Sequence, residues 1–111
     1  MVTLSERHKR FQELHKTGCF VIPNPWDQGT ARMMAALGAK ALATTSAGFA
    51  FTLGRPDMGG VSRDEALVHA EAIVSATQLP VSGDFENGFG DDPDEVAETV
   101  RLAREVGLSG C

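Results

Sequence analysis

The sequence predicts an α/β fold in which parallel strands alternate with helices. Two observations carry this prediction: short apolar runs recur along the chain, and a segment with helical capping or periodicity follows each of the first three. A chain that alternates strand and helix forms right-handed βαβ units and a parallel sheet. At 111 residues, with 42% hydrophobic and 23% charged residues, the chain fits one domain, residues 1–111.

The first unit is a helix followed by a strand. Thr3 and Glu6 fit a capping box, in which each side chain accepts a hydrogen bond from the other residue's backbone N–H. The helix should continue to about Lys16, because Gly18 is suited to end it. Residues 19–22 are continuously apolar, as expected of a strand that is covered on both faces.

The second unit begins at Asp27, which can cap a helix that runs through Leu37 and ends at Gly38. Residues 39–45 predict a second buried strand, although alanine is a poor strand former. Residues 46–57 then form a long connection, which we expect to be partly helical.

The third unit opens with a second capping box, formed by Ser62 and Glu65. Its helix carries apolar residues at helical spacing: Leu67, Ala70, Ile73 and Val74. Residues 79–83 are the third predicted strand.

The last predicted helix is capped by Asp92, has Pro93 at its first helical position and ends at Gly107. Its predicted inward-facing residues are Val96, Val100, Ala103 and Val106. Residues 108–111 begin a fourth strand.

Composition excludes several classes of function. A net charge of −5 leaves no basic face for nucleic acid or an anionic membrane surface. No apolar run approaches the roughly 20 residues that span a bilayer. The first ten residues are charged and no apolar segment follows them, so we expect that they are not a secretory signal. Cys19 and Cys111 lie far apart without CxxC spacing, so we expect free thiols and a cytoplasmic protein. The three histidines, His8, His15 and His69, lie on predicted helices and are expected at the surface.

A candidate metal site follows the third predicted strand. Asp84 and Glu86 are two residues apart, so on an extended backbone both carboxylates leave the same face, with Cα atoms about 7 Å apart. Gly83 and Gly88 flank this pair and allow tight turns. A divalent cation would offset the repulsion between the two carboxylates. The alternative, left open at this point, is that these are solvated turn acids.

The loops that follow the strands should converge. In parallel sheets, ligands bind at the C-terminal ends of the strands, whether the sheet is open or closed into a barrel. Residues 23–27, 46–60 and 85–92 would therefore share one face with the acidic pair.

Four motifs in order carry a family resemblance: FVIPNPWD at residues 20–27, TTSAG at 44–48, LGRPD at 53–57 and DFENGFG at 84–90. Together they resemble the isocitrate lyase/phosphoenolpyruvate mutase superfamily, and most closely its carboxyvinyl-carboxyphosphonate phosphorylmutase-like and 2-methylisocitrate lyase-like branch. The resemblance implies a (β/α)₈ TIM-type barrel and a Mg²⁺ cofactor, with Mn²⁺ as a substitute. It also implies enolate chemistry on small carboxylate or phosphonate substrates, and for full-length relatives a homotetramer.

The resemblance also implies roles for individual residues. Asp84 matches the principal metal acid, and Glu86 occupies the second acid position, where many relatives carry aspartate. Asp57 matches an acid that organises the water shell of the metal.

A second group of residues matches the part of the family's site that contacts substrate. Ser46, with the backbone N–H groups of Ala47 and Gly48, matches the loop that holds the substrate carboxylate or enolate oxygen. Ser46 and Asp57 are thus the predicted catalytic residues.

The chain departs from the family in length. A (β/α)₈ barrel needs about 250 residues, so we expect the N-terminal part of a barrel, with about three and a half β/α units. The family's glutamate after strand four, and its flexible loop with a catalytic lysine, find no match here. Three functions remain open: cleavage of a C–C bond next to a 2-oxo acid, of the 2-methylisocitrate or oxaloacetate type; a P–C bond mutase or hydrolase; and a catalytically inactive remnant.

Overall fold

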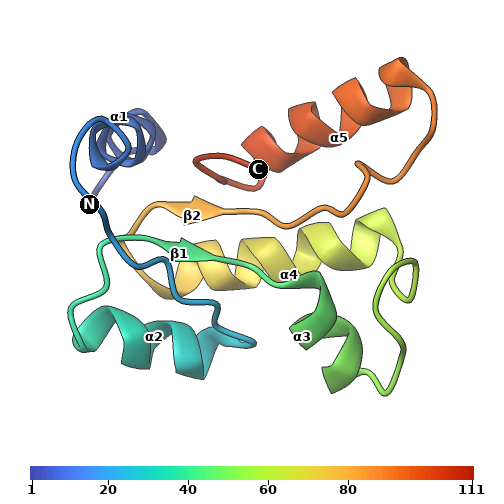
Figure 1. Cartoon of the computed structure of the whole chain (residues 1–111), viewed down its shortest axis with the longest axis horizontal. Coiled ribbons are helices and arrows are strands. Elements are labelled where there is room, and N and C mark those ends of the chain that lie inside the picture. Colours follow the sequence, from blue (N-terminus) through green and yellow to red (C-terminus); the bar gives the residue numbers. More distant parts are fainter.

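The computed structural model describes residues 1–111 as five helices around a two-stranded parallel sheet (Figure 1). This arrangement confirms the predicted α/β class. The elements, in chain order, are α1 (Leu4–Leu14), α2 (Gln28–Ala36), β1 (Leu42–Ala43), α3 (Ser46–Thr52), α4 (Arg63–Ala76), β2 (Val81–Ser82) and α5 (Pro93–Glu105).

The sheet confirms the second and third predicted strands at shorter lengths. β1 lies parallel to β2, with Leu42 opposite Val81. On the other side of β2, a parallel bridge joins Ser82 to Gly110, and the Ser109 N–H donates to the Val81 carbonyl at 2.7 Å. The predicted start of a fourth strand is therefore confirmed.

The strand predicted over residues 19–22 is wrong. This segment has no strand geometry, and its Val21 is 79% exposed. Just beyond it, the Ala43 N–H donates to the Pro23 carbonyl at 3.1 Å, so the chain runs beside β1 without forming a ladder. An apolar run indicates a buried strand only when neighbours cover it, and the sequence pattern does not contain that information.

The predicted helix starts are confirmed by their hydrogen bonds. The Thr3 N–H donates to Glu6 Oε2 at 2.7 Å and the Ser62 N–H donates to Glu65 Oε2 at 2.8 Å, each within a complete capping box. Asp27 accepts from the Thr30 N–H at 2.7 Å and so caps α2. These caps satisfy N–H groups that the first helical turn leaves free, which is why short local patterns located the helix starts.

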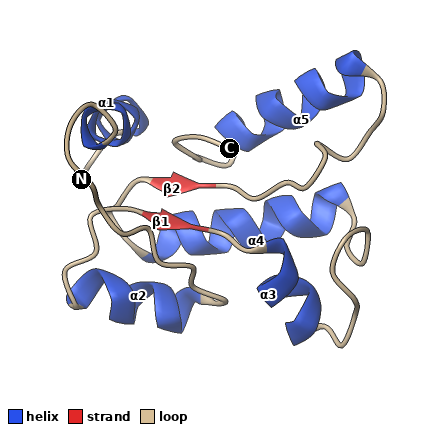
Figure 2. Cartoon of the chain, viewed as in Figure 1, coloured by secondary structure: helices blue, strands red, loops and turns tan.

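Helix α4 lies along the sheet and is the centre of the packing (Figure 2). It contacts α2, α3 and α5, and its predicted apolar stripe is buried, with Ile73 fully covered beside Leu42 and Val81. In α5 the expected inward face is wrong at one position. Val100 is 50% exposed, and the neighbouring Thr99 is buried in its place.

Helix α1 is tied to the edge of the sheet where the strands begin. The Arg7 guanidinium donates to the carbonyls of Val74 and Thr77, at 3.2 and 3.1 Å, at the end of α4. His8 Nε2 lies 2.9 Å from the Leu108 carbonyl oxygen. In Figure 1 both strand arrows point away from this edge, toward the loops described below.

Two further expectations concern the thiols and the membrane. Cys19 and Cys111 are both exposed free cysteines, as predicted. None of the helices has both the length and the apolar character required to cross a bilayer.

Candidate functional site

The ends of β1 and β2 bring the two central residues of the site together. Ser46 follows β1 and Asp84 follows β2, and because the strands are parallel both leave the same edge of the sheet. The Ser46 hydroxyl donates to Asp84 Oδ2 at 2.9 Å, and the Ser46 backbone N–H donates to the same oxygen at 3.1 Å. Asp84 therefore receives two donors from a residue 38 positions earlier in the chain.

The two other predicted acids join this pair through the loop between α3 and α4. Ser46 Oγ also lies 3.3 Å from Asp57 Oδ1. Glu86 Oε1 accepts a hydrogen bond from the Gly59 backbone N–H at 3.1 Å. The structure thus brings the predicted residues Ser46, Asp57, Asp84 and Glu86 into one cluster.

A cavity of about 430 Å³ opens at this cluster. Three of its lining residues come from the predicted set, namely Ser46, Asp57 and Glu86. The others are Met58, Gly59 and Asn87. Asp84 does not line this cavity; it is exposed and lines a smaller hollow together with Ser46. An open hollow with two acidic side chains, those of Asp57 and Glu86, thus lies at the C-terminal ends of the strands, where parallel α/β sheets bind their ligands.

The environment of Asp84 favours its ionised form. Burial raises the pKa of Asp84, but hydrogen bonds from the backbone N–H groups of Ser46 and Glu86 and from the Ser46 hydroxyl outweigh it, so the pKa lies below its ordinary value. The Asp84 N–H in turn donates at 2.9 Å to the hydroxyl of Thr44, which is buried. A carboxylate held in this way is charged at neutral pH and fixed in position.

The two loops around the cavity store backbone strain. Met58, Glu86 and Phe89 all have positive φ values, of 61°, 53° and 61°. No other non-glycine residue of the chain does. Such a conformation costs on the order of 1–3 kcal/mol and persists only where the surroundings hold it, often at functional sites.

The turn after Ser46 is the predicted substrate loop. The Gly48 N–H donates to the Thr45 hydroxyl at 3.1 Å and so caps α3, whereas the Ala47 N–H makes no hydrogen bond within the chain. Gly48 is required for packing: a Cβ there would lie 2.4 Å from Nε1 of Trp26. Of the two predicted backbone donors, only that of Ala47 is free.

Sequence reasoning missed three supporting residues. Besides Thr44, the buried Thr99 of α5 donates its hydroxyl to the Gly88 carbonyl at 2.6 Å and so holds the acidic loop. His69, expected at the surface, is half-buried and stacks on Phe49 with ring centroids 4.1 Å apart. A threonine among apolar positions on a predicted helix face was the available signal for Thr99; His69 offered none.

The donor chemistry of the cluster suits a hard divalent cation. Carboxylate and hydroxyl oxygens are the ligands that Mg²⁺ prefers, and Mg²⁺ usually keeps several waters and takes only one or two carboxylates. No three carboxylate, imidazole or thiol groups lie close enough together to enclose an ion. The residues present therefore fit a cation that is held largely through water, and do not form a complete protein cage.

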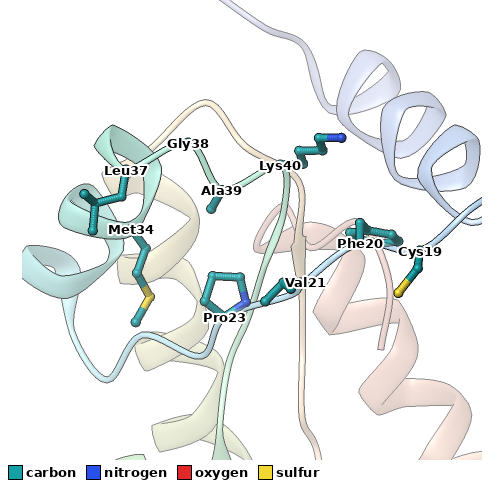
Figure 3. A pocket seen from close by; sticks show the side chains of 9 residues that line it. All are labelled: Cys19, Phe20, Val21, Pro23, Met34, Leu37, Gly38, Ala39 and Lys40. Atoms are coloured by element: carbon teal, nitrogen blue, oxygen red, sulfur yellow. The ribbon is translucent and has the colours of Figure 1, made fainter.

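A second cavity, of about 500 Å³, has no acidic residue in its lining (Figure 3). Its lining is mostly apolar and includes Val21, Pro23, Met34 and Leu37, with Lys40 at its rim. It sits beside residues 38–40, which precede β1, and so at the edge opposite to the cluster. Because it holds no acid and lies where the strands begin, we do not assign the chemistry to it.

Comparison with known proteins identifies the family of the chain. Residues 11–111 match the family model described as phosphoenolpyruvate phosphomutase. The chain is 36% identical over 100 residues to an uncharacterized protein of Mycobacterium tuberculosis, across 89% of this chain and 38% of that protein. It is 35% identical over 102 residues to the 2,3-dimethylmalate lyase of Eubacterium barkeri, across 90% and 35%. The chain thus spans less than two fifths of the length of these relatives.

Solved structures show the same fold over the same portion. A Burkholderia cenocepacia protein described as a lyase or mutase superposes with a TM-score of 0.92 at 54% identity, covering 95% of this chain and 38% of that one. A phosphonopyruvate hydrolase solved with oxalate and Mg²⁺ gives a TM-score of 0.87 at 18% identity, covering 97% and 37%. The second likeness concerns the fold alone.

Proposed function

Because the chain belongs to the phosphoenolpyruvate phosphomutase family, we propose that it takes part in Mg²⁺-dependent cleavage of a C–C bond next to a 2-oxo acid. One observation carries this proposal: Ser46 contacts both Asp84 and Asp57 at the C-terminal ends of two parallel strands, beside an open cavity that Asp57 and Glu86 line. The similarity of the chain to a 2,3-dimethylmalate lyase favours cleavage of a C–C bond in a small dicarboxylate.

Asp84 and Glu86 are the residues that would hold the cation, directly or through water, and Asp57 would orient its water shell. When bound, the ion supplies Lewis-acid polarisation of the 2-oxo group and stabilises the developing enolate charge, an effect worth several kcal/mol. The acidic loop would then attract an anionic substrate, because the ion reverses the local sign of charge.

Ser46 can donate to substrate at little cost to Asp84. A hydroxyl has one hydrogen and donates to one acceptor at a time, and the shorter of its two contacts is to Asp84. If the hydroxyl turned toward a substrate oxygen, Asp84 would keep the backbone N–H groups of Ser46 and Glu86. The free Ala47 N–H would then act beside the hydroxyl as a second donor to a substrate carboxylate or enolate oxygen.

The second candidate is P–C bond chemistry, as in a mutase or phosphonopyruvate hydrolase. It is favoured by the description of the family model that matches residues 11–111. The same acids and donors would serve either reaction, because both pass through an enolate-like species next to a carboxylate. The cytoplasmic location and the homotetramer of full-length relatives stay predictions under either function.

Activity and binding assays test the proposal together. The chain is incubated with Mg²⁺ and 2-methylisocitrate, dimethylmalate or oxaloacetate. Release of pyruvate is followed for the first two substrates, and release of oxalate for oxaloacetate. Phosphonopyruvate is tried separately. Oxalate, a planar dianion that mimics an enolate, is titrated by calorimetry with and without Mg²⁺, with Asp84→Asn as the control.

Each result has a distinct meaning. C–C cleavage supports the lyase, and phosphonopyruvate conversion in its place supports the P–C alternative. Mg²⁺-dependent oxalate binding without turnover supports a site that binds but does not catalyse, and overturns both activities for this chain. Neither turnover nor Mg²⁺-dependent binding overturns the proposal as a whole.

A further inference from the structure

We infer that Glu86 is a positioning residue that fastens the loop of residues 53–60 over the cavity. Glu86 Oε1 accepts the Gly59 backbone N–H at 3.1 Å, across 27 positions of sequence. The inference rests on the proposed function only in taking this cavity as the substrate site. It assigns to Glu86 a task that is separate from any contact with a metal ion.

The loop of residues 53–60 has little else to hold its tip. At its base, the Arg55 guanidinium donates to both carboxylate oxygens of Glu65, at 2.9 Å each. Every residue from 53 to 59 is exposed, so apolar burial does not anchor the tip. Within the loop, Arg55 also donates to the Gly60 carbonyl at 3.4 Å, and the Met58 N–H donates to Asp57 Oδ1 at 2.8 Å. Between the tip and other elements there are two polar contacts, from Asp57 to Ser46 and from Gly59 to Glu86. Segments with few buried contacts open at low free energy, so the loss of either contact should make opening of the loop measurably easier.

The backbone of Glu86 is set for this contact. Its φ of 53° is in the left-handed region, which non-glycine residues rarely adopt. The Glu86 N–H donates to Asp84 Oδ1 at 3.1 Å, and the Gly88 N–H closes the turn onto the Phe85 carbonyl at 2.8 Å. These bonds maintain the strained conformation that aims the side chain across the cavity. An aspartate at this position is one methylene shorter, and from the same backbone it would not reach Gly59.

Release of this contact would change the site. The tip of the loop carries Asp57 and Met58, which both line the cavity. With Gly59 detached, only the contact of 3.3 Å between Ser46 Oγ and Asp57 Oδ1 would join the tip to another element, and that contact has no hydrogen bond whenever the hydroxyl donates to Asp84. Glu86 therefore sets the position of Asp57 without touching it, while its second carboxylate oxygen stays available to the water shell of a cation.

Amide hydrogen exchange without metal or substrate tests the inference on the full chain. The exchange rate of the Gly59 amide is measured by NMR in the wild type and in Glu86→Ala, Glu86→Asp and Glu86→Gln. We expect exchange to rise about tenfold or more in the Ala and Asp variants, the effect of losing a hydrogen bond to a charged acceptor. The Glu86→Gln side chain has the same length and keeps an acceptor oxygen, so the exchange rate of its Gly59 amide should stay within about threefold of the wild-type rate. Glu71→Gln, an exposed change on α4, is the matched control.

The outcomes are decisive in either direction. Unchanged exchange at Gly59 in Glu86→Ala overturns the inference, as does Glu86→Gln exchanging as fast as Glu86→Ala. Circular dichroism establishes that each variant is folded; if Glu86→Ala is not, Glu86→Asp, which keeps the charge, takes its place, and unchanged exchange in that variant overturns the inference. Because no ligand is present, failure of this test leaves the proposed reaction standing, and absence of activity leaves the loop contact standing.

Discussion

The Ser46 hydroxyl and backbone N–H both donate to one oxygen of Asp84, at 2.9 and 3.1 Å. Ser46 opens α3 directly beyond β1, and Asp84 opens the acidic loop directly beyond β2. This pair joins two βα units. The position of the Asp84 carboxylate therefore depends on the fold, and the hydrogen bonds between the two residues connect the units at the C-terminal ends of the strands.

The stability of the chain should depend on the ionisation of Asp84. Its pKa is lowered in the folded state, so the ionised form contributes stability above the unfolded pKa of about 3.9, and that contribution is lost as pH falls through the folded pKa. Asp84→Asn should therefore be less stable than wild type at pH 7, and the difference should shrink below about pH 4. Urea unfolding at several pH values measures this, and a difference that grows on acidification would contradict it.

Two glycines should respond oppositely to the same substitution. At Gly48 a Cβ would lie 2.4 Å from the indole nitrogen of Trp26, so Gly48→Ala should destabilise the chain by about 1–3 kcal/mol. At Gly29 of α2 the nearest atom would be at 3.4 Å, so Gly29→Ala should stabilise by up to about 1 kcal/mol. Urea unfolding followed by fluorescence of the single tryptophan measures both. Equal effects at the two sites would refute the packing argument.

Thr99 should contribute to the stability of the chain through the hydrogen bond of its hydroxyl. This side chain is 2% exposed and donates to the Gly88 carbonyl at 2.6 Å, so Thr99→Val keeps the shape but leaves that carbonyl without its partner. We expect a loss of about 1–3 kcal/mol in the free energy of unfolding. The neighbouring Val100→Thr is the matched control, and at 50% exposure it should change stability by less than about 0.5 kcal/mol. If both variants unfold alike, Thr99 does not anchor the acidic loop.

The sequence predicted those parts of the fold that depend on local chemistry. The caps at Thr3, Ser62 and Asp92 use side chains and N–H groups within a few residues, so short patterns locate the helices. The run over residues 19–22 failed because burial depends on distant neighbours. The inward face of α5 was misplaced for a related reason: valine at position 100 fits an apolar stripe, but the helix turns Thr99 inward to meet a carbonyl of the acidic loop.

In the candidate site, too, some features were predicted from the sequence and others were not. Ser46, Asp57, Asp84 and Glu86 converge as expected, since loops that follow parallel strands share one edge. The sequence pattern does not indicate which backbone N–H group donates to which carboxylate. The contact of Gly59 with Glu86, like the cap that occupies the Gly48 N–H, depends on a donor that every non-proline residue carries.

Magnesium should stabilise the chain through Asp84. A ligand that binds only the folded state adds about 2.7 kcal/mol at 100 times its Kd, which for a domain of this size raises the Tm by on the order of 10 °C. A thermal-shift titration with MgCl₂, against KCl at matched ionic strength, measures this. Asp84→Asn should abolish most of the shift, and Glu71→Gln should retain it. The acids of the run from residue 91 to 95 are a competing location. If Asp84→Asn keeps the full shift while Asp94→Asn loses it, the ion binds there and the assignment to Asp84 is wrong.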